Sequence, residues 1–163
     1  MAENPKNQMK SDPTDSMTET DMLELTIPHL VKPEDLNHHG TLFAGQMARW
    51  LIEAGLILSS RLTGKPEDIV CVQLNAMTFK KSVNNGDLIE IRSIISYLGT
   101  TSIMVYSQVI RKQETVPLIT NSATFVTVDK VGRPYKHGLK LSEGYITKNR
   151  DVCEEALKIR GQK

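Results

Sequence analysis

The chain has 163 residues, a net charge of +1 and an apolar fraction of 39%, which are typical of one globular domain with a real core. Its 20 basic and 19 acidic residues nearly balance, so composition gives no support to nucleic-acid binding. No apolar run is long enough to span a bilayer. The first 20 residues lack the apolar segment of a secretory signal, and Cys71 and Cys153 form no CxxC pair. We therefore expect a cytoplasmic protein with free thiols.

The first half of the chain predicts a tail, a strand, a loop and a long helix. Residues 1–20 hold almost no bulky aliphatic side chains and predict a disordered tail. Residues 22–30 alternate as a strand does, and residues 31–44 form a loop. From residue 45 or 46 to residue 62, apolar side chains cover a wide arc of a helix, which favours a helix wrapped by a sheet.

The second half changes to the period-two pattern of strands. Four strands are predicted, over residues 69–79, 88–98, 102–111 and 117–128. The turn signals Asn84–Asp87 and Gly99–Thr100 are short, which predicts an antiparallel meander. Residues 142–160 predict a short amphipathic helix.

These elements divide the chain into a tail (residues 1–20), one α+β domain (residues 21–140) and a C-terminal extension (residues 141–163). In the domain, one long central helix is expected to be wrapped by a curved antiparallel β-sheet. Such a sheet leaves edges that need a cover, commonly a second copy of the chain. We therefore expect a homo-oligomer.

The most informative stretch is the loop that enters the helix, LNHHGTLFAGQMARWLIEAG over residues 36–55. It aims amide and imidazole side chains and backbone N–H groups at a helix N-terminus, and it follows them with a carboxylate. A helix N-terminus carries partial positive charge and unpaired N–H groups. Such a loop is suited to hold a carbonyl or an anion.

Five motifs in this order resemble the hotdog-fold acyl-CoA thioesterases, over residues 22–134. They are NHHGTLFAG (residues 37–45), Trp50 with Glu53-Ala54, FKKSVNNGD (residues 79–87), GTTS (residues 99–102) and TFVTVD followed by GRP (residues 124–134). The resemblance implies a hotdog fold and hydrolysis of an acyl-CoA thioester to free acid and CoA. It also implies no cofactor, since CoA is part of the substrate, and a homodimer, tetramer or hexamer with active sites between subunits.

The resemblance also implies roles for the loop residues. Backbone N–H groups at Ala44 and Gly45 would be the oxyanion donors. The alternative for Gly45 and Gly40 is that they only permit tight turns. Asn37 would orient water or the thioester, or would be a simple cap or turn residue. His38 and His39 flank the same point and would hydrogen-bond the thioester or a water, or serve only the loop structure.

The carboxylate departs from the family pattern. The acyl-CoA hydrolase branch would place its catalytic Asp at position 52, where this chain has Ile52. Glu53 follows, about 100° further round the helix. Another hotdog branch has a spacing that His38, Gly45 and Glu53 would fit. Glu53 is therefore the predicted general base or nucleophile, with a surface or interface carboxylate as the alternative. Ile52 also leaves open a non-catalytic acyl-CoA-binding or regulatory protein; a fold-related dehydratase is weaker.

CoA brings phosphates, which need cations and hydroxyl or N–H donors. The candidates are Lys80, Lys81, Arg111, Thr100, Thr101 and Ser102. The alternative for each is an ordinary solvated group. A metal site is not expected, because the histidines show no ligand spacing. Neither cysteine is near the loop, so a thiol nucleophile is not expected either.

Overall fold

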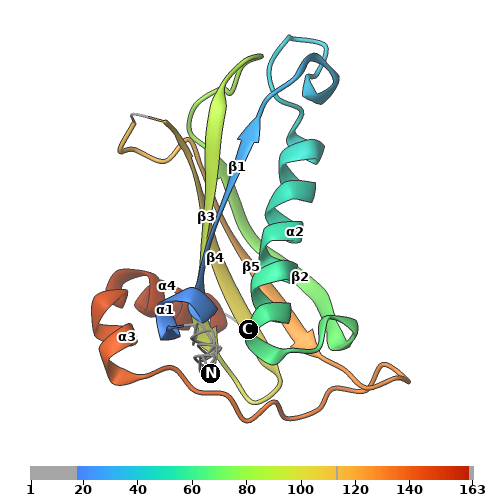
Figure 1. Ribbon diagram of the computed structural model, residues 1–163, viewed down its shortest axis with the longest axis vertical. Coiled ribbons are helices and arrows are strands. Elements are labelled where there is room, and N and C mark those ends of the chain that lie inside the picture. The colour runs from blue at the N-terminus through green and yellow to red at the C-terminus, as the bar shows by residue number, and fades with distance from the viewer. Residues whose placement is uncertain (1–17, 113, 162–163) are drawn as a thin grey trace, which may run out of the picture.

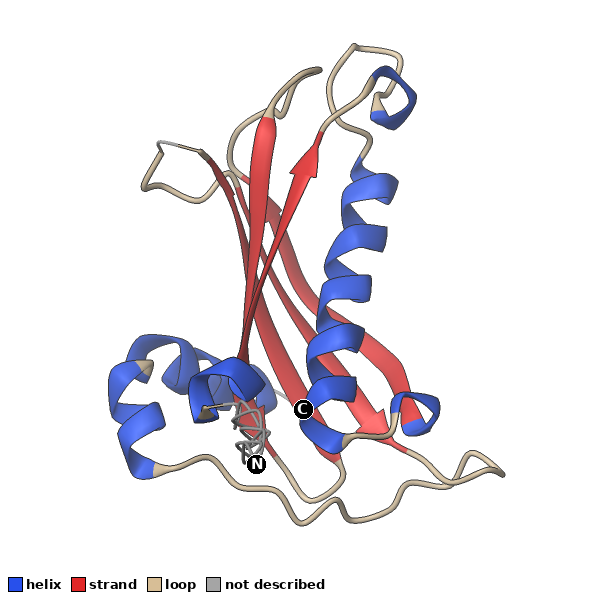
Figure 2. Ribbon diagram, in the orientation of Figure 1, coloured by secondary structure: helices blue, strands red, loops and turns tan. Residues whose placement is uncertain are grey.

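Five antiparallel strands form one curved sheet, and a long helix runs along its concave face (Figures 1 and 2). This arrangement comes from a computed structural model that describes residues 18–112 and 114–161. The helices are α1 (Glu19–Leu23), α2 (Ala44–Thr63), α3 (Glu143–Lys148) and α4 (Arg150–Gly161), with short 3-10 turns at Pro33–Asp35 and Pro66–Asp68. The strands are β1 (Glu24–Leu30), β2 (Ile69–Phe79), β3 (Leu88–Leu98), β4 (Ser102–Arg111) and β5 (Ile119–Thr127). The predicted α+β architecture is confirmed.

The beginning of the described chain differs from the prediction. Met22 and Leu23 belong to α1 and not to the first strand, which starts at Glu24. The Asp21 amide N–H donates to the Thr18 hydroxyl, while the Asp21 carboxylate accepts from the Thr18 amide N–H at 2.9 Å. These bonds cap a helical turn that buries Leu23. Residues 1–17, most of the predicted tail, lie outside the described residues.

The predicted meander is correct for β3, β4 and β5 and wrong for β2. The strand order is β1-β3-β4-β5-β2, so β2 pairs with β5 and the connection to β3 crosses the end of the sheet. The backbone groups of the Asn-Gly turn in this connection form hydrogen bonds with segments other than β2 and β3. Thr41 pairs with Asn84, and the amide N–H of Gly86 donates to the carbonyl of Val31 at 2.8 Å. A turn used in this way cannot close a hairpin between neighbouring strands.

Helix α2 lies against the sheet along one face. Met47, Leu51, Ala54 and Leu58 are fully buried there. The helix ends at Gly64, which adopts a left-handed conformation with φ of 68° and donates its amide N–H to the Ser60 carbonyl. Two apolar clusters fill the space under α2, one at each end.

A row of polar residues across three strands separates these two clusters on the sheet. The buried hydroxyls of Ser93 and Ser107 hydrogen-bond at 2.7 Å. They are paired across β3 and β4, and Asn121 of β5 continues the row. The flanking rows are aliphatic in β3 and β4. The core is therefore apolar at both ends and polar at one level between them.

The C-terminal extension forms two helices where one was predicted. Tyr145 of α3 is buried, and its hydroxyl lies 3.0 Å from the Ile95 carbonyl and 3.3 Å from the Leu23 carbonyl. Cys153 and Ala156 are buried where α4 packs on β3 and β4. Both cysteines are free thiols, as expected.

Strand β2 forms an exposed, apolar edge of the sheet. Its side chains Val70, Val72, Leu74 and Phe79 are 42% to 55% exposed. An edge strand also presents unpaired N–H and C=O groups. Among the described residues, no helix is long and apolar enough to cross a membrane.

One close approach in the core predicts an unusual response to mutation. A Cβ atom added at Gly55 would lie 2.6 Å from ring carbons of Phe125 in β5. Replacing a helical glycine by alanine normally stabilises by up to about 1 kcal/mol. We expect Gly55→Ala to destabilise instead, by roughly 1–3 kcal/mol, because the ring must move.

The matched control is Gly144→Ala in α3, where an added Cβ meets no atom within 4 Å. Urea titration of both variants measures the difference. A Gly55→Ala protein that is as stable as the Gly144→Ala protein would contradict this packing.

Candidate active site

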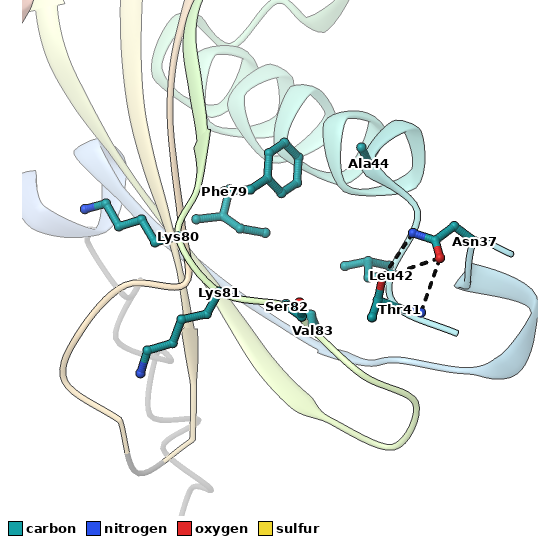
Figure 3. A pocket seen from close by; sticks show the side chains of 10 residues that line it. Asn37, Thr41, Leu42, Ala44, Phe79, Lys80, Lys81, Ser82 and Val83 are labelled. Carbon is teal, nitrogen blue, oxygen red and sulfur yellow. Dashed lines mark hydrogen bonds between the residues drawn. The ribbon is translucent and has the colours of Figure 1, made fainter. Parts of the chain in front are cut away.

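A cleft of about 340 Å³ opens between the start of α2 and the end of β2 (Figure 3). Its lining residues are Asn37, Thr41, Leu42, Ala44, Phe79, Lys80, Lys81, Ser82, Val83 and Ile119. The Phe79 ring points toward the start of the helix, whereas the Lys80 and Lys81 side chains extend away from Asn37. Four predicted site residues therefore meet at one cleft: Asn37, Ala44, Lys80 and Lys81.

The two segments that build this cleft hold each other through their backbones. The Leu42 amide N–H donates to the Val83 carbonyl at 2.8 Å, beside the bridge between Thr41 and Asn84. The Phe43 amide N–H donates to the carbonyl of Asp35 at 2.8 Å. The loop before α2 is therefore held on both sides, and the direction in which α2 starts follows from these bonds.

Asn37 closes the loop with its own side chain. Its Nδ2 donates to the Thr41 hydroxyl at 3.0 Å, and its Oδ1 accepts from the His39 amide N–H at 2.8 Å. The Oδ1 atom also lies 3.4 Å from the Thr41 amide N (Figure 3). An amide carries two N–H donors, so one Nδ2 hydrogen remains for a substrate or a water.

The first two amides of α2 are unpaired. In the described part of the chain, neither the Ala44 N–H nor the Gly45 N–H donates a hydrogen bond, whereas Gln46 N–H donates to the Phe43 carbonyl at 3.0 Å. Free N–H groups at the positive end of a helix dipole can stabilise a negative oxygen. Gly45 also provides space, since an added Cβ would lie 2.5 Å from the Phe43 ring.

Glu53 and Ile52 lie on opposite flanks of α2. Glu53 is three residues after Trp50, whose ring stacks on His29 of β1 with 4.4 Å between centroids. Ile52 is three residues before Gly55, which contacts β5. Residues three apart share a helix flank. Glu53, which is exposed, therefore faces the β1 side, and Ile52 faces the side of β5 and β2.

The histidines differ in their settings. His38 and His39 are exposed and contact each other, with 3.9 Å between ring centroids, and neither lines the cleft. Gly40 has a φ of 75° and supplies the tight turn beside them. Burial lowers the pKa of His29, and the negative charge of Glu53 opposes that shift.

Sequence reasoning missed His29 as a neighbour of the helix and Phe79 as a cleft residue. The period-two pattern of residues 22–30 could have placed His29 on the same face as Ile27, toward α2. Phe79 is the last residue of β2, at the point where the strand reaches the start of α2. This position was available only once the sheet order was known. Within the described chain, no cluster of three or more His, Cys, Asp or Glu side chains could hold a metal ion.

The predicted cations are not equivalent. Arg111 pairs with Asp87 at 2.8 Å and with Glu114 at 2.6 Å, and Lys81 pairs with Glu114 at 3.2 Å. Lys80 makes no ion pair with any described residue. Arg111 and Lys81 are thus already partly neutralised, whereas no described carboxylate pairs with Lys80, which also lines the cleft.

Thr100, Thr101 and Ser102 lie at the other end of the sheet from the cleft. Thr100 and Thr101 lie in the turn between β3 and β4, and Ser102 begins β4, near the C-terminal end of α2 (Figure 1). The Thr101 carbonyl accepts from the Thr127 amide N–H at 3.0 Å. Within a single chain, these three residues are therefore far from the start of α2.

Residues 39–118 match the family model of the thioesterase superfamily. The chain is 33% identical over 119 residues to an uncharacterised acyl-CoA thioester hydrolase of Buchnera aphidicola subsp. Baizongia pistaciae, covering 68% of this chain and 86% of that protein. The chain belongs to the acyl-CoA thioester hydrolase family.

Two further proteins extend the comparison. The uncharacterised acyl-CoA thioester hydrolase YkhA of Bacillus subtilis is 28% identical over 108 residues, covering 64% of this chain and 62% of that protein. The structure of an apo-hexameric acyl-CoA thioesterase is similar with a TM-score of 0.73 at 23% identity, covering 85% of this chain and 89% of the other. The hotdog fold expected from the motifs is confirmed.

The ion pairs beside the cleft predict a pH dependence of stability. Burial raises the pKa of Asp87, but hydrogen bonds from Arg111 and from the Asn84 amide outweigh it and lower the pKa below the ordinary aspartate value. The unfolded chain then binds the proton first as pH falls. The stabilisation is present at pH 7 and is lost below about pH 4.

We expect Asp87→Asn to lower the Tm at pH 7, and the difference from the parent to narrow by pH 3. The control is Glu154→Gln, which replaces an exposed carboxylate of α4 and should change the Tm neither at pH 7 nor at pH 3. A gap that stays constant between pH 7 and pH 3 would contradict a stabilising charge on Asp87. Melting curves across this range measure the effect.

Proposed function

We propose that the chain hydrolyses an acyl-CoA thioester to a free acid and CoA. The observation that carries this proposal is the pair of unpaired N–H groups of Ala44 and Gly45, at the end of a cleft that also presents an amide side chain. A thioester needs a polarised carbonyl, an aimed water and room for the thiolate. Membership of the acyl-CoA thioester hydrolase family supports the same chemistry.

In the proposed reaction the N–H groups of Ala44 and Gly45 hold the carbonyl oxygen as it becomes negative. The free Nδ2 hydrogen of Asn37 orients the thioester or the water. Glu53 takes a proton from water, whose oxygen attacks the carbonyl carbon. The C–S bond then breaks, and Glu53 returns the proton to the thiolate of CoA, which leaves as the thiol. A direct attack by Glu53, through an anhydride that water then opens, is the covalent variant. Lys80 holds a phosphate of CoA, and no further cofactor is needed.

The carboxylate must come from another copy of the chain. Glu53 follows Ala44 by nine residues of α2, which is about 13 Å along the helix axis. A glutamate side chain is too short to span that distance. The loop of one subunit and the helix of another would therefore complete each site, and we propose a homodimer or an assembly of dimers.

The edge of β2 is one surface that supports this assembly. Glu53 lies on the opposite flank of α2, toward β1, so the copy that supplies Glu53 would meet the cleft through a further interface of an assembly of dimers. The β2 edge is apolar and presents free backbone groups, which a second β2 can pair with. Two-fold symmetry makes such a pairing antiparallel. The Thr100–Ser102 turn of the second copy would then come to the cleft end of the first, which is how these residues would contribute to CoA binding. A similar structure is that of a hexameric thioesterase.

A non-catalytic acyl-CoA-binding or regulatory protein is the second candidate function. The observation that favours it is the position of Ile52 on the flank of α2 that faces β2. An apolar side chain there offers no base to a copy paired through β2. In this alternative the cleft and the free N–H groups would hold the thioester without cleaving it.

The proposed assembly predicts a concentration-stable oligomer larger than the 18.2 kDa chain. Val72→Lys places a charge on the exposed edge of β2 and should shift the protein toward monomer. Val131→Lys, at a side chain that is 72% exposed in the turn after β5, is the matched control and should leave the mass unchanged. Light scattering at micromolar concentration decides; a parent that is monomeric would refute the shared site.

The proposed base predicts a large loss of turnover in one conservative variant. Glu53→Gln keeps the shape and removes the base, so thiol release should fall by roughly two to four orders of magnitude. Binding of CoA should persist, because its phosphates are held elsewhere. Asn37→Ala should lower turnover by less, and Glu154→Gln should leave it unchanged.

The assay measures thiol release from a panel of aliphatic and aromatic acyl-CoAs of different length. Full activity in Glu53→Gln would show that the base is His38, His39 or another group. A parent that binds acyl-CoA but releases no thiol from any member of the panel would replace the proposed enzyme with the binding protein.

A further inference from the structure

Arg111, at the end of β4, is held by three groups from two segments. Its guanidinium donates to the Asp87 carboxylate at 2.8 Å, to the Ser82 carbonyl at 3.2 Å and to the Glu114 carboxylate at 2.6 Å. The side chain is 26% exposed. Hydrogen bonds to Asp87 and Glu114 raise the pKa of Arg111 further, so its charge is permanent.

Two of these partners bracket the crossover that builds the cleft. Ser82 and Asp87 stand on either side of the residues that pair with the loop before α2. The Asp87 carboxylate also accepts from the Asn84 amide N–H at 2.8 Å. Asn84 bridges to Thr41, and Val83 accepts from the Leu42 amide. Arg111 is therefore one layer of contacts away from the loop that positions Asn37.

We propose that Arg111 is a positioning residue for the cleft and not a phosphate ligand. The hydrogen bonds of its guanidinium join the two ends of the crossover, and the crossover in turn fixes the position of the loop and of the first turn of α2. The expected effect of Arg111 on catalysis rests on the proposed thioesterase function. The claim that Arg111 holds the loop in place rests only on the contacts of Arg111.

The local charges support this assignment. Two carboxylates, Asp87 and Glu114, already face Arg111, and Lys81 shares Glu114. A phosphate that approached Arg111 would meet their negative charges. Lys80 lines the cleft and meets no carboxylate among the described residues, so the phosphate role falls to it.

The kinetic test compares Arg111→Ala with the parent on two substrates, an acyl-CoA and the matching acyl-pantetheine, which lacks the nucleotide phosphates. A misplaced loop should lower kcat by about 10- to 100-fold on both substrates, with KM nearly unchanged. Arg111→Lys should recover part of the loss. Arg92→Ala, which removes another ion-paired arginine from the same sheet, is the matched control and should retain activity.

A second readout needs no activity. Hydrogen exchange at the amide of Leu42 reports the bond to Val83, and it should become at least tenfold faster in Arg111→Ala and remain slow in Arg92→Ala. If Arg111→Ala does not fold, Asp87→Asn removes the same contact with a smaller change and should show the same acceleration.

The outcomes separate this inference from the proposed function. A rise in KM for acyl-CoA alone, with exchange at Leu42 unchanged, would overturn the positioning role and make Arg111 a phosphate ligand. Faster exchange at Leu42 in a protein that cleaves no thioester would refute the proposed function and support the held loop.

Discussion

The whole site depends on the pairing between the loop before α2 and the crossover from β2 to β3. Neither segment belongs to the sheet, and each would leave backbone groups without partners if it stood alone. Together they satisfy one another through Leu42 and Val83, Thr41 and Asn84. The loop therefore has a defined path although it is irregular, and α2 starts where two of its amides remain free to meet a substrate.

Local patterns were sufficient for the elements and insufficient for their order. The period of apolar residues predicted α2 and the four later strands to within about two residues at their ends. The Asn-Gly turn before β3 predicts a hairpin that the fold does not contain, because a turn signal is local and carries no information about which strand is the neighbour in the sheet. For the same reason the sequence predicts Thr100 and Asn37 in one site, whereas within one chain the fold puts them at opposite ends of the sheet.

In the candidate site, too, some features are predictable from local sequence and others depend on the order of the strands. The free amides of Ala44 and Gly45 followed from a local motif and from the general properties of helix ends. The partners of Arg111 did not, because Asp87 and Glu114 reach it only through the sheet order. The site that we propose to be shared by two chains would have a further consequence. Activity and association would become linked equilibria, so specific activity should depend on protein concentration near the dissociation constant of the assembly.

The hydrogen-bonded serines in the core bear on how the sheet selects its alignment. A slip of β3 against β4 by two residues would keep every side chain on its face, so the apolar pattern alone does not prevent it. It would, however, set Ser93 and Ser107 opposite aliphatic neighbours and bury two hydroxyls without partners, at about 1–3 kcal/mol each. The hydrogen bond between Ser93 and Ser107 thus favours one register of β3 against β4, whose neighbouring core pairs are aliphatic and would fit a shifted register almost as well.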